Sequence, residues 1–257
     1  MEERVERIII TGGQTKSGEP EPVQQLEIEA GEIIAVVGPT GSGKSMLLND
    51  IEQMAVGDTP SQRRVEIETS NECGERVIAQ LSQTMNFVID MTVADFLDLH
   101  AASRGLRDPA AVREEVIHLA NELVGESFRG DERITTLSGG QSRALMIADI
   151  ALISNAPIVL IDEIENAGID RLRALKMLAK HGKIVLIASH DPLIILMADR
   201  RLVMRNGGMT KLLLPTDQEQ QCLDELLILD EQRSSLCESL RNGDSVNISI
   251  EKVGVQI

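Results

Sequence analysis

Residues 33–45 constrain the fold most strongly, because they join an apolar run to a glycine-rich segment and then to a helix-like segment. The run Ile33–Val37 is short, apolar and rich in β-branched residues, as is typical of a buried strand. Gly38-Pro39-Thr40-Gly41-Ser42-Gly43-Lys44-Ser45 follows it, and Lys44–Met54 has the pattern of a helix. Glycines let a backbone curl closely around an anion. A strand, a loop and a helix in this order predict an α/β sheet with a phosphate site at the end of one strand.

Apolar runs alternate with helix-like segments along the rest of the chain. Continuous apolar runs at Pro157–Ile161 and Lys183–Ser189 predict two further buried strands, and Asn206-Gly207-Gly208 is a strong hairpin signal. The other expected strands are Val5–Ile10, Val23–Ala30, Ile78–Gln83, Arg201–Arg205, Thr210–Leu214 and an alternating segment at 246–250. The expected helices are one that begins after Thr92, then Pro109–Leu123, Gln141–Ile153, Asp170–Lys180 and Asp217–Arg241. This order predicts an α/β protein with a mostly parallel sheet, an N-terminal antiparallel β part and a small helical subdomain.

Composition and charge exclude several classes of protein. The chain has 257 residues, of which 42% are hydrophobic, and a formal net charge of −16. This acidic balance argues against a protein that grips nucleic acid through a basic surface, so no nucleic acid partner is expected. The longest apolar runs are too short to span a bilayer, and the first residues lack a signal-peptide pattern. The three cysteines have neither metal-ligand nor disulfide spacing, so a cytoplasmic location is expected.

The glycine-rich loop has the residue types needed to bind a polyphosphate. Its backbone N–H groups and the N-terminal end of the next helix favour an anion. Lys44 supplies a cation for the β- and γ-phosphates, and Ser45 offers a hydroxyl to Mg²⁺. The alternative is a chance match in a glycine-containing loop, which the flanking strand and helix make less favoured.

Two later segments contain further candidate site residues. Asp162 and Glu163 end the strand after Pro157, where one carboxylate could hold Mg²⁺ through water and the other could orient an attacking water. Leu137-Ser138-Gly139-Gly140-Gln141 places a hydroxyl and two glycines at a helix start, which makes a second anion site. Two anion sites on one chain suggest a nucleotide shared between two copies. The alternatives are an ordinary acidic loop and an ordinary serine N-cap.

Taken in order, these segments resemble an ABC-type ATPase, the nucleotide-binding domain of ATP-binding cassette proteins. The resemblance covers roughly residues 5–214 and rests on motifs that occur in the family's order. They are Walker A at Gly38–Ser45, the Q-loop at Ser82-Gln83-Thr84, the signature at Leu137–Gln141, Walker B at Ile158–Glu163, the D-loop at Ala167–Asp170 and the switch histidine His190. The resemblance implies a P-loop NTPase fold of ABC type over residues 1–216, with a helical subdomain at about 85–153 and a C-terminal helix and strand extension at 217–257.

The resemblance also implies a role for each matching residue. The cofactors would be ATP and Mg²⁺, with ATP hydrolysed to ADP and phosphate by a head-to-tail homodimer that sandwiches two ATP molecules. The catalytic residues would be Glu163 as general base, His190 on the γ-phosphate, Lys44 and Gln83. The residues that serve Mg²⁺ and its waters would be Ser45, Gln83 and Asp162. The nucleotide-binding residues would be Gly38, Pro39, Thr40, Gly41, Ser42, Gly43, Lys44, Ser45 and Met46, with Ser138, Gly139, Gly140 and Gln141 supplied by the opposing subunit.

The chain departs from the family's pattern at several positions. The family stacks adenine on an aromatic residue near the N-terminus, but no aromatic residue precedes Phe87 here, so aliphatic contacts are expected to hold the base. After the signature, Arg143 is displaced by one position and Asp149 stands where arginine is frequent. Glu165 adds an acid near the catalytic glutamate. These changes bear on coupling between subunits more than on nucleotide binding.

Three functions are compatible with these motifs. The compact helical subdomain and the acidic charge favour the ATP-hydrolysing subunit of a transporter, acting with a separate membrane permease at the inner face of the cell membrane. Ile89 and Met91, with Phe87 and Val88, would form either an apolar docking patch for that permease or part of the core. A soluble ABC ATPase that remodels or activates another protein is the first alternative. A nucleotide-sensing module with little hydrolysis is the second.

Overall fold

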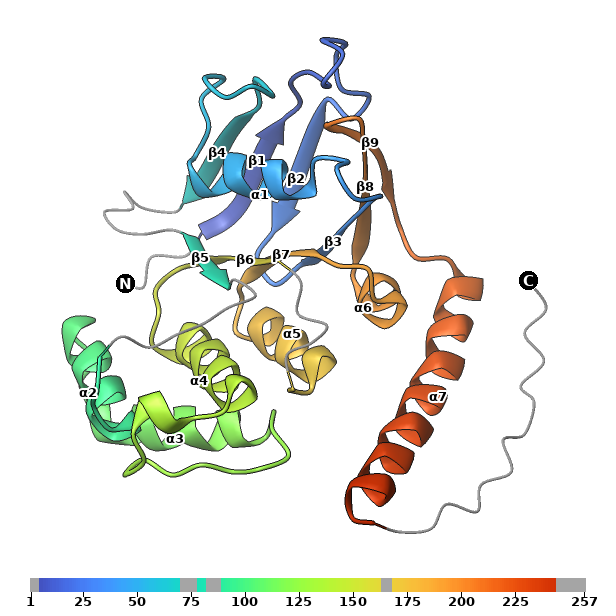
Figure 1. The fold of residues 1–257 in the computed structure, drawn as a ribbon. Helices are drawn as coiled ribbons and strands as arrows, with labels where there is room; N and C mark the ends of the chain where they lie inside the picture. Colours follow the sequence, from blue (N-terminus) through green and yellow to red (C-terminus); the bar gives the residue numbers. More distant parts are fainter. Residues whose placement is uncertain (1–4, 70–77, 82–88, 163–167, 244–257) are drawn as a thin grey trace. The chain divides into compact units, whose positions relative to one another are not determined.

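The computed structural model describes residues 5–69, 78–81, 89–162 and 168–243 (Figure 1). The chain divides into two compact units, Met1–Pro215 and Thr216–Ile257. In the second unit the described structure is mainly one long helix, α7 (Asp217–Arg241), which has the bounds expected from the sequence. The strand expected at 246–250 lies outside the described residues.

A six-stranded sheet forms the centre of the first unit. Its strand order is β5-β6-β7-β3-β8-β9, and every neighbouring pair is parallel except β8 and β9. The strands are β3 (Ile33–Val37), β5 (Ile78–Leu81), β6 (Ile158–Asp162), β7 (Ile184–Ala188), β8 (Arg200–Arg205) and β9 (Gly208–Leu213). This arrangement confirms the predicted α/β architecture with a mostly parallel sheet.

The continuous apolar runs form central strands because both faces of this sheet are covered. In β3, Ile34 and Val36 pack with α1 and the antiparallel strands, whereas Ile33 and Ala35 belong to the core on the opposite face. The residues of β6 and β7 divide between the same two cores. Helices α4 and α5 lie on one side of the sheet, and α1 lies on the other with the antiparallel strands (Figure 1). Alternate residues of one strand point to opposite faces, so a strand buried on both sides needs no polar positions.

A three-stranded antiparallel sheet in the order β2-β1-β4 forms the N-terminal β part. Its strands are β1 (Val5–Thr11), β2 (Gln25–Glu29) and β4 (Arg64–Thr69). The first two were predicted from the sequence. The third was not, because charged residues occupy every second position of Arg64–Glu68 and the apolar signal is short. Residues 64–69 form a strand because they pair with β1.

Side chains cap most of the helices of the first unit. The helices are α1 (Lys44–Glu52), α2 (Val93–Ser103), α3 (Pro109–Asn121), the 3₁₀ turn η1 (Ile134–Thr136), α4 (Gly139–Leu152), α5 (Arg171–Lys180) and α6 (Pro192–Met197). Thr92 is the N-cap of α2 and accepts the N–H of Asp95, which confirms the predicted helix start after Thr92. Helix α6 was not predicted, because its six residues are too few to show a helical period, although Asp191 caps it and Pro192 begins it.

The turn between β8 and β9 has the geometry that its sequence predicts. Asn206 and Gly207 both have positive φ angles, 48° and 82°, as a two-residue hairpin turn of type I′ requires. The N–H of Gly207 donates to the carbonyl of Ser42 at 2.8 Å. The hairpin turn therefore contacts the glycine-rich loop after β3.

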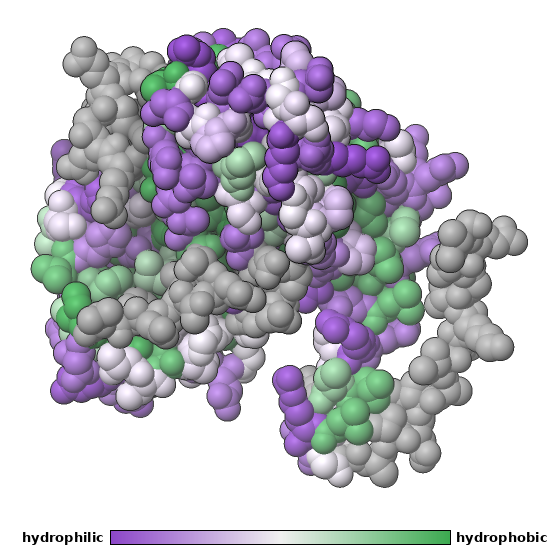
Figure 2. Space-filling view, turned by 45° about the horizontal axis from the view of Figure 1, so that its top comes forward, coloured by the Kyte–Doolittle hydropathy of each residue, from purple (hydrophilic) through white to green (hydrophobic). Residues whose placement is uncertain are grey.

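The face of the molecule drawn in Figure 2 is mainly hydrophilic. On the face drawn in Figure 2, hydrophobic residues form separate patches among charged and polar ones. The large hydrophobic residues that are most exposed are Val56, Ile89, Leu99, Leu214, Ile228 and Leu240. Of the four residues considered for a docking patch, Ile89 is 57% exposed and Met91 packs against the core, while Phe87 and Val88 lie outside the described residues. None of the helices in the described ranges combines the length and the apolar character that crossing a membrane would require.

Candidate functional site

The loop that leaves β3 leads into an α-helix whose first turn has no side-chain cap. Gly43 is the N-cap of α1 with φ 103°, and no side chain there accepts an N–H. Each of the helices α2 to α6 instead has a capping Thr, Asp or Ser that accepts an N–H of the first turn. The N-terminal N–H groups of α1 are therefore available to an anion, as at a phosphate-binding helix end.

A cavity of about 530 Å³ lies at this helix end. Residues from distant parts of the chain line it: Lys16, Thr40, Gly41, Ser42, Gly43, Lys44, Ser45, Met46, Gln80, Asp162 and His190. Strands β3, β6 and β7 run parallel, so the loops after their carboxyl ends meet at one edge of the sheet. That edge is where open α/β sheets bind ligands.

Four of the polar side chains expected at the site meet in this cavity. Lys44 Nζ donates to the carbonyl oxygen of Gly38 at 2.8 Å and lies 3.2 Å from Nε2 of His190. Ser45 Oγ lies 3.5 Å from Oδ2 of Asp162. A cation thus lies beside the loop, and a hydroxyl faces a carboxylate next to it. Such oxygen donors fit Mg²⁺, although within the described ranges no group of three or more His, Cys, Asp or Glu residues could hold a metal ion.

The remaining residues of the predicted nucleotide loop fall into two groups. Thr40 to Met46 line the cavity. Gly38 and Pro39 are not among the lining residues; their carbonyls accept the Lys44 ammonium and the N–H of Ser42. Two predicted catalytic residues, Gln83 and Glu163, lie outside the described residues.

Lys16 and Gln80 line the cavity although no sequence motif marks them. Lys16 Nζ donates to the carbonyl oxygen of Gly41 at 2.8 Å, and its backbone N–H donates to Asn206 at 2.8 Å. Only the loop's glycine- and proline-rich composition marks residues 11–22 in the sequence, and that composition does not single out Lys16. Gln80 lies on β5 and precedes the predicted Q-loop closely in the sequence.

The signature segment lies at a different helix end. Ser138 caps α4 by accepting the N–H of Gln141, and Gln141 in turn accepts the N–H of Ser138 at 2.8 Å. Ser138 and Gly139 are exposed. None of residues 138–141 is among the described residues that line the cavity. Gly140 instead adjoins Gly168 of the predicted D-loop, whose added Cβ would lie 3.6 Å from the Gly140 Cα.

The residues that depart from the family's pattern after the signature lie in the protein interior. Arg143 and Asp149 are 8% and 2% exposed. Burial lowers the pKa of the Arg143 guanidinium. Asp149 Oδ1 lies 2.7 Å from His100 Nδ1 on the neighbouring helix α2. Both side chains are therefore part of the packed interior around α4.

Comparisons with known proteins show what this chain is similar to. A family model described as "ABC transporter" matches residues 23–166. An uncharacterised ABC transporter ATP-binding protein of Methanocaldococcus jannaschii is 53% identical over 247 residues, which cover 93% of this chain and 94% of that protein. The macrolide export ATP-binding/permease protein MacB of Salmonella typhimurium is 31% identical over 200 residues, which cover 71% of this chain but only 30% of MacB.

Solved structures share the fold. The ATP-binding subunit of an ABC transporter superposes with a TM-score of 0.59 at 20% identity, covering 86% of this chain and 98% of that one. An ATP-binding cassette solved as a dimer in a post-hydrolysis state with ADP and phosphate gives a TM-score of 0.58 at 24% identity, covering 81% of this chain and 99% of that one.

Proposed function

Because this chain belongs to the ABC transporter family of ATP-binding ATPases, we propose that it is the ATP-hydrolysing subunit of a transporter and works with a separate membrane permease. The observation that carries the proposal is the meeting of Lys44, Ser45, Asp162 and His190 at an uncapped helix end. The match to MacB, whose name joins an ATP-binding protein to a permease, supports an association with a permease here.

The polyphosphate of ATP would lie at the N-terminal end of α1. The N–H groups of that turn and the ammonium of Lys44 would bind its oxygens. Lys44 Nζ is held between the Gly38 carbonyl and His190, so the cation is already positioned before the anion arrives. Ser45 and Asp162 would hold Mg²⁺, with Gln83 as the third predicted contact. Mg²⁺, when bound, would neutralise charge on the β- and γ-phosphates.

Hydrolysis requires a base and a contact to the terminal phosphate. Glu163, next to Asp162 at the end of β6, would accept a proton from the attacking water. The water oxygen would form a bond to the γ-phosphorus as the bond from that phosphorus to the β–γ bridging oxygen breaks. His190 would contact the γ-phosphate, since its ring already lies beside the Lys44 ammonium that binds the same group.

A second copy of the chain would complete each site. Ser138 and Gly139 are exposed at the start of α4 and do not line the cavity of their own chain. In a head-to-tail homodimer they would cover the ATP bound by the other copy, with Gly140 and Gln141 beside them. Two ATP molecules would then be sandwiched between the subunits.

Substitution of Lys44 tests nucleotide binding directly. Lys44→Ala should weaken ATP binding at least about tenfold, because a charge-assisted hydrogen bond contributes about 1.5–3 kcal/mol. Lys176→Ala is the matched control, since Lys176 is exposed on α5 away from the cavity. Titration with ATP and assay of phosphate release should show weaker binding and slower hydrolysis for Lys44→Ala than for Lys176→Ala. Equal ATP affinities of the two variants would contradict the proposed nucleotide site.

A purification experiment tests the transport role. The native complex, extracted in detergent, should contain this chain with an integral membrane protein. Full ATPase activity of the purified chain without such a partner would favour the soluble ATPase instead. ATP binding with no phosphate release would favour a nucleotide sensor.

A further inference from the structure

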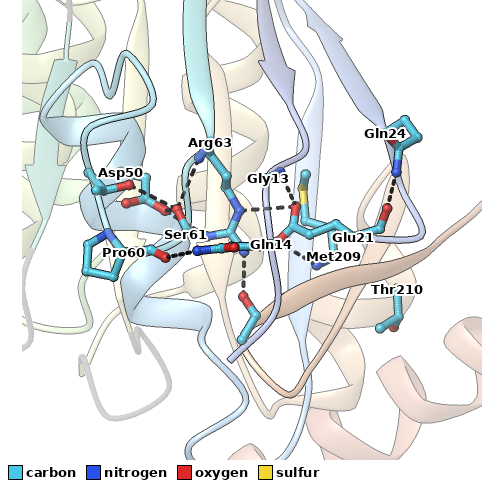
Figure 3. Close-up of polar contacts among 12 residues, drawn as sticks. Gly13, Gln14, Glu21, Gln24, Asp50, Pro60, Ser61, Arg63, Met209 and Thr210 are labelled. Carbon is cyan, nitrogen blue, oxygen red and sulfur yellow. Dashed lines mark hydrogen bonds and ion pairs between the residues drawn. The ribbon is translucent and has the colours of Figure 1, made fainter. Parts of the chain in front are cut away.

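Arg63 is a fully buried arginine that lies between two buried carboxylates (Figure 3). Its Nη1 donates to Oδ2 of Asp50 at 2.7 Å, and its Nε donates to Oε2 of Glu21 at 3.3 Å. Its Nη2 donates to Oε1 of Glu21 and, at 2.6 Å, to the carbonyl oxygen of Gly207. These residues are called the Arg63 cluster below: Glu21, Asp50, Ser61, Arg63 and Gly207.

The Arg63 cluster joins four segments that are distant in the sequence. Glu21 lies in the loop between β1 and β2, and Asp50 lies on α1. Arg63 immediately precedes β4, and Gly207 is in the turn between β8 and β9. Ser61 Oγ adds a hydrogen bond to Asp50 Oδ2 at 2.7 Å. A single guanidinium therefore fixes the relative positions of these segments with its planar set of donors.

The Arg63 cluster reaches the nucleotide loop through Gly207. The carbonyl of Gly207 accepts from Arg63, and its N–H donates to the carbonyl of Ser42 at 2.8 Å. Gly207 also packs closely on the loop, because a Cβ added to Gly43 would lie 2.8 Å from the Gly207 Cα. Glu21 holds the other side of the same turn, since its Oε1 accepts the N–H of Met209 at 3.2 Å.

Stability alone is a weak explanation for such a cluster. Well-packed apolar residues in place of a buried ion pair often leave a protein equally or more stable, whereas removal of one partner is costly. The distinctive feature of Arg63 is its position. It contacts Asp50 on α1, and it also contacts Gly207 in the turn whose N–H donates to the carbonyl of Ser42 in the phosphate loop. Both elements determine where the loop's N–H groups point.

We propose that Arg63 is a positioning residue for the nucleotide site. With Glu21 and Asp50 it holds the turn at 206–208 against the phosphate loop and keeps the loop and α1 in the geometry that binds the polyphosphate. This inference rests on the proposed function. It adds a network that contacts no nucleotide itself and acts through Gly207 and Asp50.

Arg63→Lys is the first test. A lysine keeps the charge but has one ammonium group, which cannot reach Asp50, Glu21 and Gly207 together. The variant should raise the Kd and KM for ATP about tenfold and change kcat less than about threefold, as expected when uniform binding is lost. Measurements belong at a temperature where circular dichroism shows the variant folded.

Arg200→Lys is the matched control. Arg200 Nη2 also bridges a carboxylate and a backbone carbonyl, Glu32 Oε2 at 2.6 Å and Glu27 at 2.6 Å, at a place that does not line the cavity. The melting temperature of the Arg200→Lys protein should fall, while its Kd for ATP should stay within about twofold of the wild-type value. Wild-type ATP affinity in a folded Arg63→Lys protein would overturn the inference.

A second pair of variants, Glu21→Gln and Asp50→Asn, tests the positioning role of Arg63 if Arg63→Lys does not fold. Both oxygens of Glu21 accept hydrogen bonds, from Arg63 and from the N–H groups of Gly13 and Met209, so an amide in Glu21→Gln would place a donor against donors. Asp50 Oδ1 is buried and has no hydrogen-bond partner among the described residues, so Asp50→Asn can place its NH₂ there. Glu21→Gln should weaken ATP binding about tenfold and Asp50→Asn about twofold or less.

The outcomes separate the inference from the function on which it rests. Wild-type protein that fails to bind ATP in the same titration would overturn the proposed function and this inference with it. Wild-type protein that binds ATP, beside a folded Glu21→Gln protein that binds it with wild-type affinity, would overturn the inference alone.

Discussion

At the scale of single residues, two lysines approach one phosphate loop from different segments. Lys44 donates to the carbonyl of Gly38, and Lys16 donates to the carbonyl of Gly41. Besides Lys44, whose ammonium is assigned to the phosphates, Lys16 and Met46 are the cavity-lining residues with long aliphatic portions. Since no aromatic residue precedes Phe87, we expect these aliphatic portions to contact the nucleobase.

Weak discrimination between nucleobases follows from such contacts. Aliphatic groups offer no hydrogen bond that distinguishes the edge of adenine from that of guanine, and apolar contacts alone give at most about hundredfold discrimination. We expect the Kd values for ATP and GTP to differ by less than about tenfold. Competitive titration of the wild type with both nucleotides measures this ratio. A preference for ATP above about hundredfold would contradict the expectation.

The residues that could be predicted from the sequence belong to ordered motifs. The cavity brings together Lys44, Ser45, Asp162 and His190, which local patterns and their order along the chain had selected. Arg63 was not predicted, because its partners lie 13, 42 and 144 residues away and a charged residue is normally expected at the surface. Lys16 was missed for the same physical reason, since loop closure rather than local pattern places it at the cavity.

At the scale of elements, a buried lysine connects the end of α4 to β7. Lys183 is 8% exposed, and its Nζ donates to the carbonyls of Ser154 at 2.7 Å and Ala156 at 3.0 Å. Burial lowers the pKa of Lys183 to about 8, although the charge of Asp149 opposes this shift. The unfolded chain keeps the ordinary value of 10.5. Between these two pH values the unfolded state binds more protons at Lys183, so the contribution of this residue to stability must rise with pH.

Lys183→Met tests this linkage. The free energy of unfolding of the wild type, relative to the variant, should rise by about 2 kcal/mol from pH 8 to pH 10, because each unit of pKa shift is worth about 1.4 kcal/mol. Below about pH 8 the difference should be constant. Urea titrations of both proteins measure it, and the other titrating groups cancel because both proteins contain them. A difference that is independent of pH up to 10 would contradict the lowered pKa.

The strands that could be predicted from the sequence are those whose apolar runs reflect burial on both faces of the sheet. Strands β3, β6 and β7 are apolar on both faces, so their runs identify them without knowledge of their partners. Strand β4 was missed because it depends on a distant partner strand, whereas α6 was missed because its six residues are too few to show a helical period, although its start signal is local. Strand β4 pairs with β1, and α6 begins at the capping carboxylate of Asp191.

At the scale of the whole molecule, one chain contains two surfaces that we propose to bind nucleotide, and the described residues of the second do not line the cavity of the first. The phosphate loop, Asp162 and His190 line the cavity, while Ser138 and Gly139 are exposed at the start of α4. The proposed assembly joins the cavity of one copy to the α4 end of another. ATP would then be the ligand that holds two copies together.

Light scattering of Glu163→Gln protein tests this central claim most directly. The substitution should stop hydrolysis and leave ATP binding intact, so saturating ATP should convert the protein from the mass of one chain to the mass of two. The double variant Glu163→Gln, Ser138→Arg should bind one ATP per chain and keep the mass of one chain, since arginine would block the exposed end of α4. A Glu163→Gln protein that binds ATP yet stays at the mass of one chain, or a double variant that dimerises equally well, would contradict the account.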